Sequence, residues 1–341
     1  MSEGANSKCT SLILTYVEYK NFLRLCFIYE TGTMKNKKSG IAIISIILYS
    51  NYNYAIEFTD SRYIIMSHNN QKKIAVINDY SGFGRCSMAV ALPIISHMRV
   101  QCCPVPTSIF SNHTGFEHYF FDDYTDRMQA YIDNWKLLDL RFEGIATGFL
   151  GSNQQIEIVE RFIRDFRDER TKVIIDPVMG DDGKPYPTYT PKMCEKMKQL
   201  VQYADILLPN LTECCILTDT EYKKSGWKKE ELFVMVEKLA QFGAKKIAVT
   251  GIEVGSYIGN LVYEVGKEPV LIKTKRVGHE RAGTGDIYAS VIAADAVNQV
   301  DFVKSVRKAS LFVKKCILAT EKMEIPATDG VCFEEVLHEL K

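Results

Sequence analysis

Short apolar runs alternate with amphipathic stretches from Lys73 to the end of the chain. The apolar runs are rich in β-branched residues, which predicts buried strands, and the stretches between them have helical spacing. The predicted strands are Lys73–Asn78, Val100–Cys103, Gly144–Thr147, Lys172–Asp176, Ala204–Leu208 and Lys245–Thr250, with short antiparallel strands over residues 256–274. The predicted helices are Cys86–His97, Thr125–Trp135, Asn153–Arg167, Pro191–Gln202, Lys229–Phe242, Thr284–Val297 and Phe302–Thr320.

Strands that alternate with helices indicate βαβ units, and therefore a mostly parallel sheet with helices on both faces. The sequence has no internal repeat and no low-complexity linker, so we expect one α/β domain. In such a sheet the chemistry lies beyond the carboxyl ends of the strands. Polar and glycine-rich segments follow the predicted strands: Asn78-Asp79, Thr107–Thr114, Thr147–Ser152, Asp176–Asp181, Asn210–Glu213 and Thr250-Gly251.

Composition narrows the class of protein. The 341 residues are 46% hydrophobic and 25% charged, with 42 basic and 42 acidic residues. A balanced charge argues against nucleic acid or a membrane surface as the partner. None of the ten cysteines forms a C-x-x-C motif, and two pairs are adjacent, Cys102-Cys103 and Cys214-Cys215. We expect reduced, packed thiols and a cytoplasmic protein without a thiol-based zinc site.

Residues 1–65 differ from the rest of the chain. An apolar run, Ile41–Tyr49, follows the basic patch Lys35–Lys38 and is too short for a membrane span. Met66 then precedes a short polar lead and the first clean strand. We expect translation to start at Met66, with residues 1–65 as a gene-model extension; a poorly ordered real extension and a targeting segment are the alternatives. The α/β domain is predicted to span residues 66–341.

The strongest local motif is Arg281-Ala-Gly283-Thr284-Gly285-Asp286, which leads into an apolar helix. Two glycines let the backbone turn tightly, and the N–H groups of a helix N-terminus favour an anion. An aspartate beside such an anion hole can accept a proton from an alcohol while a phosphoryl group is transferred. The alternative is a plain loop and N-cap. The chain has no P-loop motif, and Gly82-Phe83-Gly84 does not complete a dinucleotide fingerprint.

The motif Gly283–Asp286 resembles the C-terminal signature of the ribokinase superfamily. Further segments resemble those of pyridoxal kinases: Pro106–Gly115, Thr147–Ser152, Ile175–Gly180 and Leu208–Glu213. The resemblance runs in order from about Lys73 to the C-terminus. It implies a ribokinase-like three-layer α/β fold, with a mostly parallel central sheet and helices on both faces. It also implies transfer of phosphate from Mg²⁺-ATP to the 5'-hydroxymethyl group of pyridoxal, pyridoxamine or pyridoxine.

The resemblance assigns roles to individual residues. Asp286 would be the general base, and the backbone of Gly283, Thr284 and Gly285 would hold the γ-phosphoryl group. On the nucleotide side, Asp176 would lie near the triphosphate, Asn210 and Glu213 would organise Mg²⁺ and phosphates through water, and Thr250 would contact ATP. On the substrate side, Thr107 would touch the pyridine ring, and Asn78 lies near a substrate-binding serine of the family. The match at Asn78 is loose, because Asp79–Arg85 replaces a different glycine-containing turn. The resemblance also implies a homodimer and allows a monovalent-cation requirement.

Several assignments have plainer alternatives. Asn210 and Glu213 have capping-box spacing, and Asp176-Pro177 could be a strand end and turn. His113 is expected to be a hydrogen-bonded structural histidine, and the aromatic cluster His118–Phe121 to be core or dimer interface rather than a substrate flap. The nearest rival function is a hydroxymethylpyrimidine kinase of thiamine synthesis. A non-catalytic vitamer-binding protein, a sugar or nucleoside kinase and a nicotinamide reductase are weaker alternatives.

Overall fold

The computed structural model describes residues 67–340 in full and, nearer the N-terminus, only the backbone of four strands. Residues 1–12, 20–21, 32–39, 50–53, 57–66 and 341 lie outside this description. The chain divides into two compact units, Met1–Met66 and Ser67–Lys341, one residue from the boundary that the sequence predicts. Each unit is described by itself.

The N-terminal unit contains an antiparallel sheet. Its strands are β1 (Ile13–Tyr19), β2 (Phe22–Thr31), β3 (Gly40–Tyr49) and β4 (Tyr54–Ile56), which pair in chain order. The apolar run Ile41–Tyr49 lies in β3. The interpretation of residues 1–65 as a gene-model or poorly ordered extension, with a translation start at Met66, stays a prediction.

The second unit is built on a sheet of nine described strands in the order β15-β14-β13-β12-β9-β8-β5-β6-β7. The strands are β5 (Lys73–Phe83), β6 (Gln101–Asn112), β7 (Phe121–Asp123), β8 (Gly144–Thr147), β9 (Lys172–Ile175), β12 (Ile206–Leu207), β13 (Lys246–Val254), β14 (Tyr257–Glu264) and β15 (Val270–Lys275). The central strands pair in parallel, and β7, β14 and β15 are antiparallel. A small hairpin, β10 (Gly180–Asp181) and β11 (Lys184–Pro185), stands apart.

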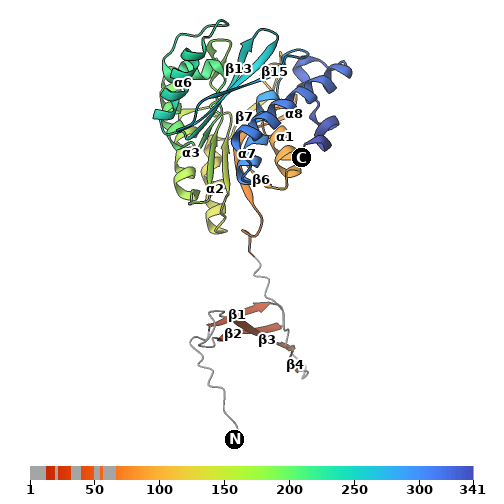
Figure 1. Cartoon of the computed structure of the whole chain (residues 1–341). Helices are drawn as coiled ribbons and strands as arrows, with labels where there is room; N and C mark the ends of the chain where they lie inside the picture. The colour runs from red at the N-terminus through yellow and green to blue at the C-terminus, as the bar shows by residue number, and fades with distance from the viewer. Residues whose placement is uncertain (1–12, 20–21, 32–39, 50–53, 57–66, 341) are drawn as a thin grey trace. The chain divides into compact units, whose positions relative to one another are not determined.

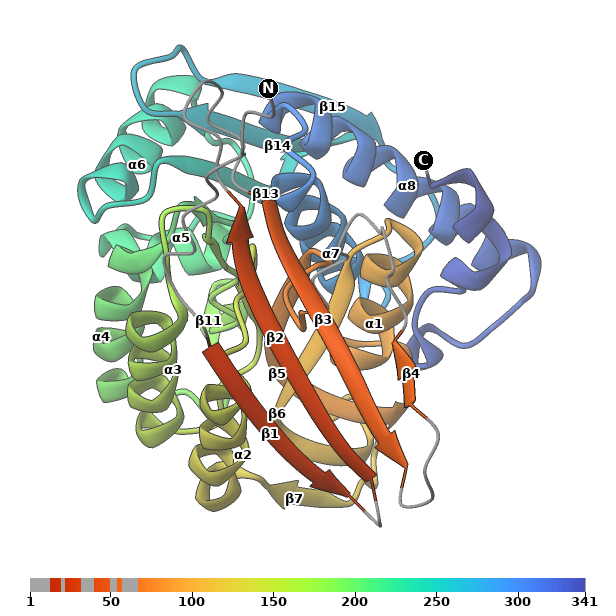
Figure 2. The same cartoon turned by 90° about the horizontal axis from the view of Figure 1, so that it is seen from below.

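Helices cover both faces of this sheet (Figures 1 and 2). One face carries α1 (Ser87–His97), α7 (Thr284–Val297) and α8 (Phe302–Lys322). The other carries α2 (Thr125–Leu137), α3 (Asn153–Phe166), α4 (Pro191–Leu200), α5 (Leu211–Thr218) and α6 (Lys229–Gln241). Short 3-10 turns are η1 (Val201–Tyr203), η2 (Ala327–Asp329) and η3 (Phe333–Glu339).

Alternate residues of the central strands enter two separate cores. Ile74 and Val76 of β5 pack with α1, α7 and α8, whereas Ala75 and Ile77 pack with the helices of the other face. Successive side chains of a strand point to opposite faces, so a strand that is buried on both faces is apolar at every position. The predicted three-layer α/β fold is confirmed.

Two strands are longer than the sequence predicts. β5 and β6 run on to Phe83 and Asn112, paired in parallel with a register shift between Asn78 and Tyr80, and β7 pairs with Ser108–Phe110. The prediction that Asn78 and Thr107 follow their strands is therefore wrong, because both lie inside them. The prolines of β6, Pro104 and Pro106, precede the segment that pairs with β7. β6 is an edge strand there and tolerates the missing N–H groups.

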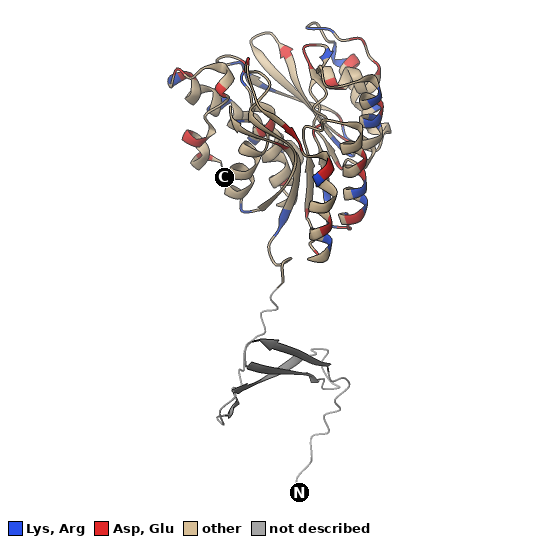
Figure 3. Cartoon of the chain, turned by 180° about the vertical axis from the view of Figure 1, so that it is seen from behind, with Lys and Arg blue, Asp and Glu red and all other residues tan. Residues whose placement is uncertain are grey.

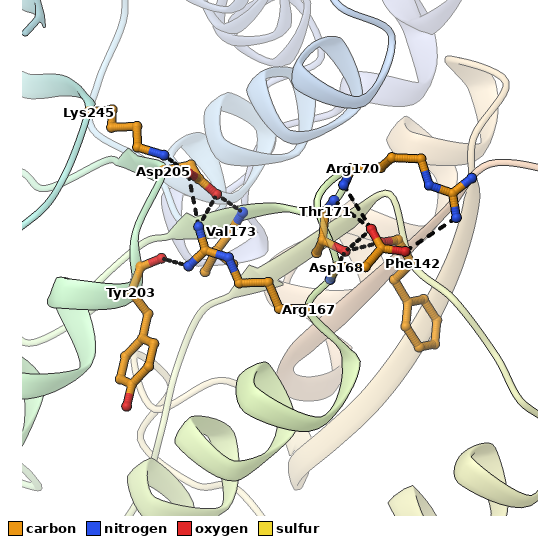
Figure 4. A network of polar contacts seen from close by, with 9 residues as sticks. All are labelled: Phe142, Arg167, Asp168, Arg170, Thr171, Val173, Tyr203, Asp205 and Lys245. Atoms are coloured by element: carbon orange, nitrogen blue, oxygen red, sulfur yellow. Dashed lines mark hydrogen bonds and ion pairs between the residues drawn. The ribbon is translucent and has the colours of Figure 1, made fainter.

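The amino ends of β9, β12 and β13 are held by one buried carboxylate (Figure 4). Asp205 accepts hydrogen bonds from both sides: two from the Arg167 guanidinium at 3.0 and 3.1 Å, one from Lys245 at 3.0 Å and one from the Val173 N–H at 3.0 Å. A buried charge is tolerated when it is paired in this way. This end of the sheet is structural, since every Asp205 oxygen is used by the protein.

Charged residues of both signs lie along the helices (Figure 3). Among the described residues, no helix is both long and apolar enough to cross a bilayer.

The eight cysteines of the described region are free thiols, as the sequence predicts.

Candidate active site

Gly283 and Arg281 fix the loop that leads into α7. Gly283 is the N-cap with φ 81°, and a Cβ at this position would collide with the carbonyl oxygen of Arg85 in the turn before α1. Both the conformation and the close packing therefore require glycine. The Arg281 side chain is 5% exposed and binds Glu321 at 3.1 Å and the carbonyl of Ile325 at 2.7 Å. Arg281 anchors the loop to the end of α8, so its guanidinium is engaged within the protein.

Gly285 occupies a different environment from Gly283. It is exposed, its φ is not positive, and nothing lies within 4 Å of the place where a Cβ would be. Packing within the described part of the chain therefore gives no reason for a glycine here. The space is open beside the first turn of α7, whose N–H groups lack helical partners. This arrangement suits an anionic ligand that approaches the backbone closely.

Asp286 follows in the first turn of α7. The Asn78 side-chain amide donates to its carboxylate at 3.5 Å, and the backbone N–H of Ser87 acts on it as a further hydrogen-bond donor. Burial raises the pKa of Asp286, and these two donors lower the pKa only in part. A carboxylate with a raised pKa that is still oriented by neutral donors is suited to accept a proton.

Asn78 is held in place from several directions. Its Oδ1 accepts hydrogen bonds from the N–H groups of Asp79 at 2.9 Å and Phe149 at 2.8 Å, which leaves its Nδ2 directed at Asp286. A Cβ at Gly148 would collide with the Asn78 amide. The segment after β8 therefore packs directly on Asn78. The sequence predicts Asn78 as a substrate residue, and in the structure its amide orients the candidate base.

Asp79 belongs to the same cluster, although no sequence motif predicts a role for it. Its carboxylate is 5% exposed and accepts hydrogen bonds from Ser87 Oγ at 2.6 Å and Ser81 Oγ at 3.0 Å. Burial raises the pKa of Asp79 to about 6, and the nearby charge of Asp286 adds to this effect. In the sequence, the feature that could have indicated this role is an acidic residue, Asp79, two positions before Ser81 in a buried strand.

Asn210 and Glu213 form the capping box of α5, a helix that the sequence analysis does not delimit. The Glu213 N–H donates to Asn210 Oδ1 at 2.9 Å, and the Asn210 N–H donates to Glu213 Oε2 at 2.8 Å. Glu213 Oε1 accepts the Met179 N–H at 2.9 Å, and Asn210 Nδ2 donates to the Gly180 carbonyl at 2.8 Å. The capping alternative is thus observed. The pair also ties α5 to the segment after β9.

Asp176 and Glu213 repel each other across this segment. Burial raises the pKa of Glu213 to about 7. Burial raises the pKa of Asp176 well above its ordinary value, and the charges of Glu213 and Asp286 raise it further. The Val178 N–H opposes this rise. Asp176 therefore costs free energy when it is ionised in the protein alone.

Four carboxylates lie at this end of the sheet. Within residues 67–340, no ion pair involves Asp79, Asp176, Glu213 or Asp286, in contrast to the doubly paired Asp205 at the other end of the sheet. The same region contains no group of three His, Cys, Asp or Glu side chains able to hold a metal alone. Carboxylates without an ion-pair partner are suited to a divalent cation, and Mg²⁺ is commonly bound through few protein ligands and the phosphates of a nucleotide. Asp176 suits this role better than Glu213, whose oxygens accept backbone N–H groups.

Thr250 and Thr107 occupy different environments. Thr250 is half-buried at the irregular point of β13, where its N–H donates to the Pro209 carbonyl at 3.0 Å and it bridges to Asn210. It borders the open edge of the sheet. Thr107 is fully buried, and its hydroxyl donates to the Phe149 carbonyl at 3.0 Å. The structure thus uses Thr107 to support the segment beside Asn78, and its predicted substrate contact stays a prediction.

His113 is a structural histidine, as the sequence predicts. Its Nδ1 accepts the Gly115 N–H at 3.1 Å, so Nε2 carries the proton and donates to the Thr328 carbonyl at 2.7 Å. The aromatic cluster near β7 is not core, because Tyr119, Phe120 and Phe121 are 47%, 64% and 46% exposed. The core alternative for this cluster is wrong, because β7 is an edge strand that leaves these rings uncovered.

Most of the predicted residues therefore gather at one end of the sheet, at the irregular points of β5 and β13, just after β9 and β12, and at the start of α7. A three-layer α/β fold with a carboxylate at this glycine-lined helix start is the arrangement of a ribokinase-like kinase. The chain belongs to the phosphomethylpyrimidine kinase family, whose model matches residues 91–330. The resemblance seen in the sequence is confirmed at this level.

Individual relatives carry two kinds of name. A Bacteroides thetaiotaomicron protein provisionally assigned as a phosphomethylpyrimidine kinase, solved in a form with pyridoxal, is 36% identical with a TM-score of 0.76; the match covers 79% of this chain and 96% of that one. The hydroxymethylpyrimidine/phosphomethylpyrimidine kinase of Aquifex aeolicus is 25% identical over 54% of this chain and 71% of its own length. The pyridoxal kinase of Sus scrofa is also 25% identical, but the match spans only 62% of its length.

Proposed function

We propose that this protein transfers the γ-phosphoryl group of ATP to the 5'-hydroxymethyl group of a vitamin B6 alcohol. The observation that carries the proposal is the position of Asp286. Its carboxylate stands in the first turn of α7, one residue from the open Gly285, and the Asn78 amide is directed at it. A proton acceptor next to an anion site is what phosphoryl transfer to an alcohol requires.

The proposed reaction uses this geometry as follows. The alcohol oxygen attacks the γ-phosphorus in line, Asp286 takes the hydroxyl proton, and the bond between the γ-phosphorus and the bridging oxygen of ADP breaks. The backbone N–H groups of Gly283, Thr284 and Gly285 face the phosphoryl oxygens on which charge spreads. Positioning provides most of the catalysis, because phosphoryl transfer needs little covalent participation from the protein.

Magnesium would bind beside Asp176, with Glu213 and Asn210 reaching it through water. When bound, it would neutralise charge on the phosphates and on these carboxylates. Thr250 borders the proposed nucleotide site from the end of β13. The excess of unpaired acidic groups in this region supports the proposal, since each is less costly next to a divalent cation.

The B6 substrate is supported by the relative solved in a form with pyridoxal, which is 36% identical to this chain. The matched family and the Aquifex relative favour a second candidate, hydroxymethylpyrimidine or its phosphate, through the same base and anion site. Both substrates are planar nitrogen heterocycles with a hydroxymethyl group. They differ in their ring atoms and substituents, and we place the ring of the substrate next to Asn78 and the segment beside Thr107.

A direct assay separates these candidates. The full-length protein is supplied with Mg²⁺-ATP and, separately, with pyridoxal, pyridoxamine, pyridoxine and hydroxymethylpyrimidine, and both ADP release and product mass are measured. Higher kcat/KM on a B6 vitamer supports the proposal and identifies the vitamer. Higher kcat/KM on the pyrimidine would instead assign the protein to thiamine synthesis. Tight vitamer binding without turnover would support a non-catalytic binding protein.

We further propose a cytoplasmic homodimer, with a monovalent cation as an additional requirement. Light scattering of the full-length protein tests the dimer, and a monomeric mass would reject it. Cell fractionation tests the location. Replacing K⁺ by a bulky organic cation tests the cation requirement, and unchanged turnover would reject it.

A further inference from the structure

The turn between β5 and α1 is held in an unfavourable backbone conformation. Arg85 and Ser87 have φ angles of 39° and 53°, although neither is glycine, and Gly84 before them has φ 104°. Left-handed conformations cost a non-glycine residue on the order of 1 kcal/mol or more. Such strain persists only where the surrounding structure imposes it, and it marks functional sites more often than other positions.

Two contacts impose this conformation. The Ser87 hydroxyl donates to Asp79 Oδ1 at 2.6 Å, a short hydrogen bond between residues that are both more than nine-tenths buried. The Arg85 carbonyl packs against Gly283 so closely that no Cβ fits there. The turn is thus fixed between the carboxylate of β5 and the start of α7.

The strained turn lies next to Asp286 and affects its hydrogen-bond donors. The Ser87 backbone N–H acts on the Asp286 carboxylate, and the Asp79 N–H holds the Asn78 amide that is directed at the same carboxylate. Both donors to the candidate base therefore depend on Asp79, one through its side chain and one through its backbone. Ser81 also donates to Asp79, at 3.0 Å, but it has no recorded contact with Asp286.

We propose that Asp79 is a positioning residue, which acts through Ser87 to hold the proton-accepting carboxylate of Asp286 in its productive orientation. This inference rests on the proposed function, in which Asp286 is the base. The Asp79 carboxylate accepts the Ser87 hydroxyl at 2.6 Å, and the Ser87 backbone N–H, as a hydrogen-bond donor, lowers the pKa of Asp286. Asp79 itself touches neither substrate nor nucleotide in this account.

Steady-state kinetics of four variants test the link. Asp79→Ala and Ser87→Ala remove the two ends of the hydrogen bond, and we expect kcat to fall on the order of tenfold or more, with KM for ATP within about twofold. Asp79→Asn keeps an oxygen that can accept the Ser87 hydroxyl, so kcat should return to within about threefold of wild type. Ser81→Ala is the matched control; it removes the other hydroxyl from Asp79 and should leave kcat unchanged.

Wild-type kcat in both Asp79→Ala and Ser87→Ala would overturn the inference, as would an equal loss in Ser81→Ala. A crystal structure of Asp79→Ala adds a readout that needs no activity. The inference expects Ser87 to leave its left-handed conformation and its N–H to turn away from Asp286. An unchanged turn would overturn it. If the wild type phosphorylates no offered alcohol, the proposed function fails, and the crystal structure alone still decides whether Asp79 orients Asp286.

Discussion

The Nδ2 atom of Asn78 lies 3.5 Å from a carboxylate oxygen of Asp286, although the two residues are 208 positions apart. This contact joins the irregular point of β5 to the first turn of α7. It also explains why Gly148 must be glycine, because a Cβ there would displace the Asn78 amide. The candidate base in α7 is therefore oriented by Asn78 of β5, which is itself held by the segment that contains Gly148.

Replacing Asp286 by Asn should abolish proton transfer while the nucleotide site stays intact. Loss of a general base costs about 10²- to 10⁴-fold in rate, so kcat should fall by a factor of about 10² or more. ATP affinity, measured by calorimetry, should change little. Asp126→Asn, an exposed position in the first turn of α2, is the control and should keep wild-type kcat. Near-normal turnover of Asp286→Asn would remove this residue from the mechanism.

The two glycines of the motif should respond differently to alanine. Gly283→Ala forces a Cβ onto the Arg85 carbonyl at φ 81° and should lower the melting temperature markedly. Gly285→Ala meets open space, so its stability should be unchanged. The new methyl group would stand where we place the phosphoryl group, and KM for ATP should rise or kcat fall at least tenfold. Full activity of Gly285→Ala would place the phosphoryl group elsewhere.

Glu213→Gln should affect both stability and the magnesium requirement. Both Glu213 oxygens accept backbone N–H groups, and the amide of Gln would direct a donor at one of them. The lost acceptor should cost about 1–3 kcal/mol of unfolding free energy, measured by urea denaturation. The Mg²⁺ concentration for half-maximal activity should also rise.

Glu231→Gln is the matched control for this variant, because Glu231 occupies the same capping-box position on α6 away from the site. It should leave the magnesium dependence unchanged. If Glu213→Gln also leaves it unchanged, Glu213 is a helix cap only.

Asp79→Asn should stabilise the protein at neutral pH. The folded protein holds the Asp79 proton up to about pH 6, whereas an unfolded aspartate releases it near 3.8. The contribution of Asp79 to stability is therefore fully present below pH 3.8 and is lost as pH rises through about 6. Removing the charge should recover up to about 3 kcal/mol at pH 8, and less at pH 5. Urea unfolding at both pH values measures this, and a gain that is independent of pH would contradict the assignment.

Much of the site was visible in the sequence because its residues occur in short local motifs. Gly283–Asp286 stands out through glycine chemistry and a helix start, whereas Asn210 and Glu213 are assigned to the site by the family resemblance, with capping-box spacing as the alternative. The separate roles of the two glycines were not visible, because the Arg85 carbonyl that excludes a side chain at Gly283 comes from a turn about 200 residues earlier. The role of Asp79 could not be predicted for the same reason, because its partner Ser87 acts on Asp286, which is far away in the sequence.

The sequence by itself determined the alternation of strands and helices, the two apolar faces of the central strands and the segments that carry the chemistry. These depend on local spacing and on burial, which leave a periodic trace along the chain. Only the tertiary structure decided how far β5 and β6 extend, that Thr107 is buried, and that the four carboxylates at one end of the sheet form no ion pair in the described region, unlike Asp205. Pairing, burial and electrostatic repulsion between distant segments arise when the sheet is assembled, and no local pattern records them.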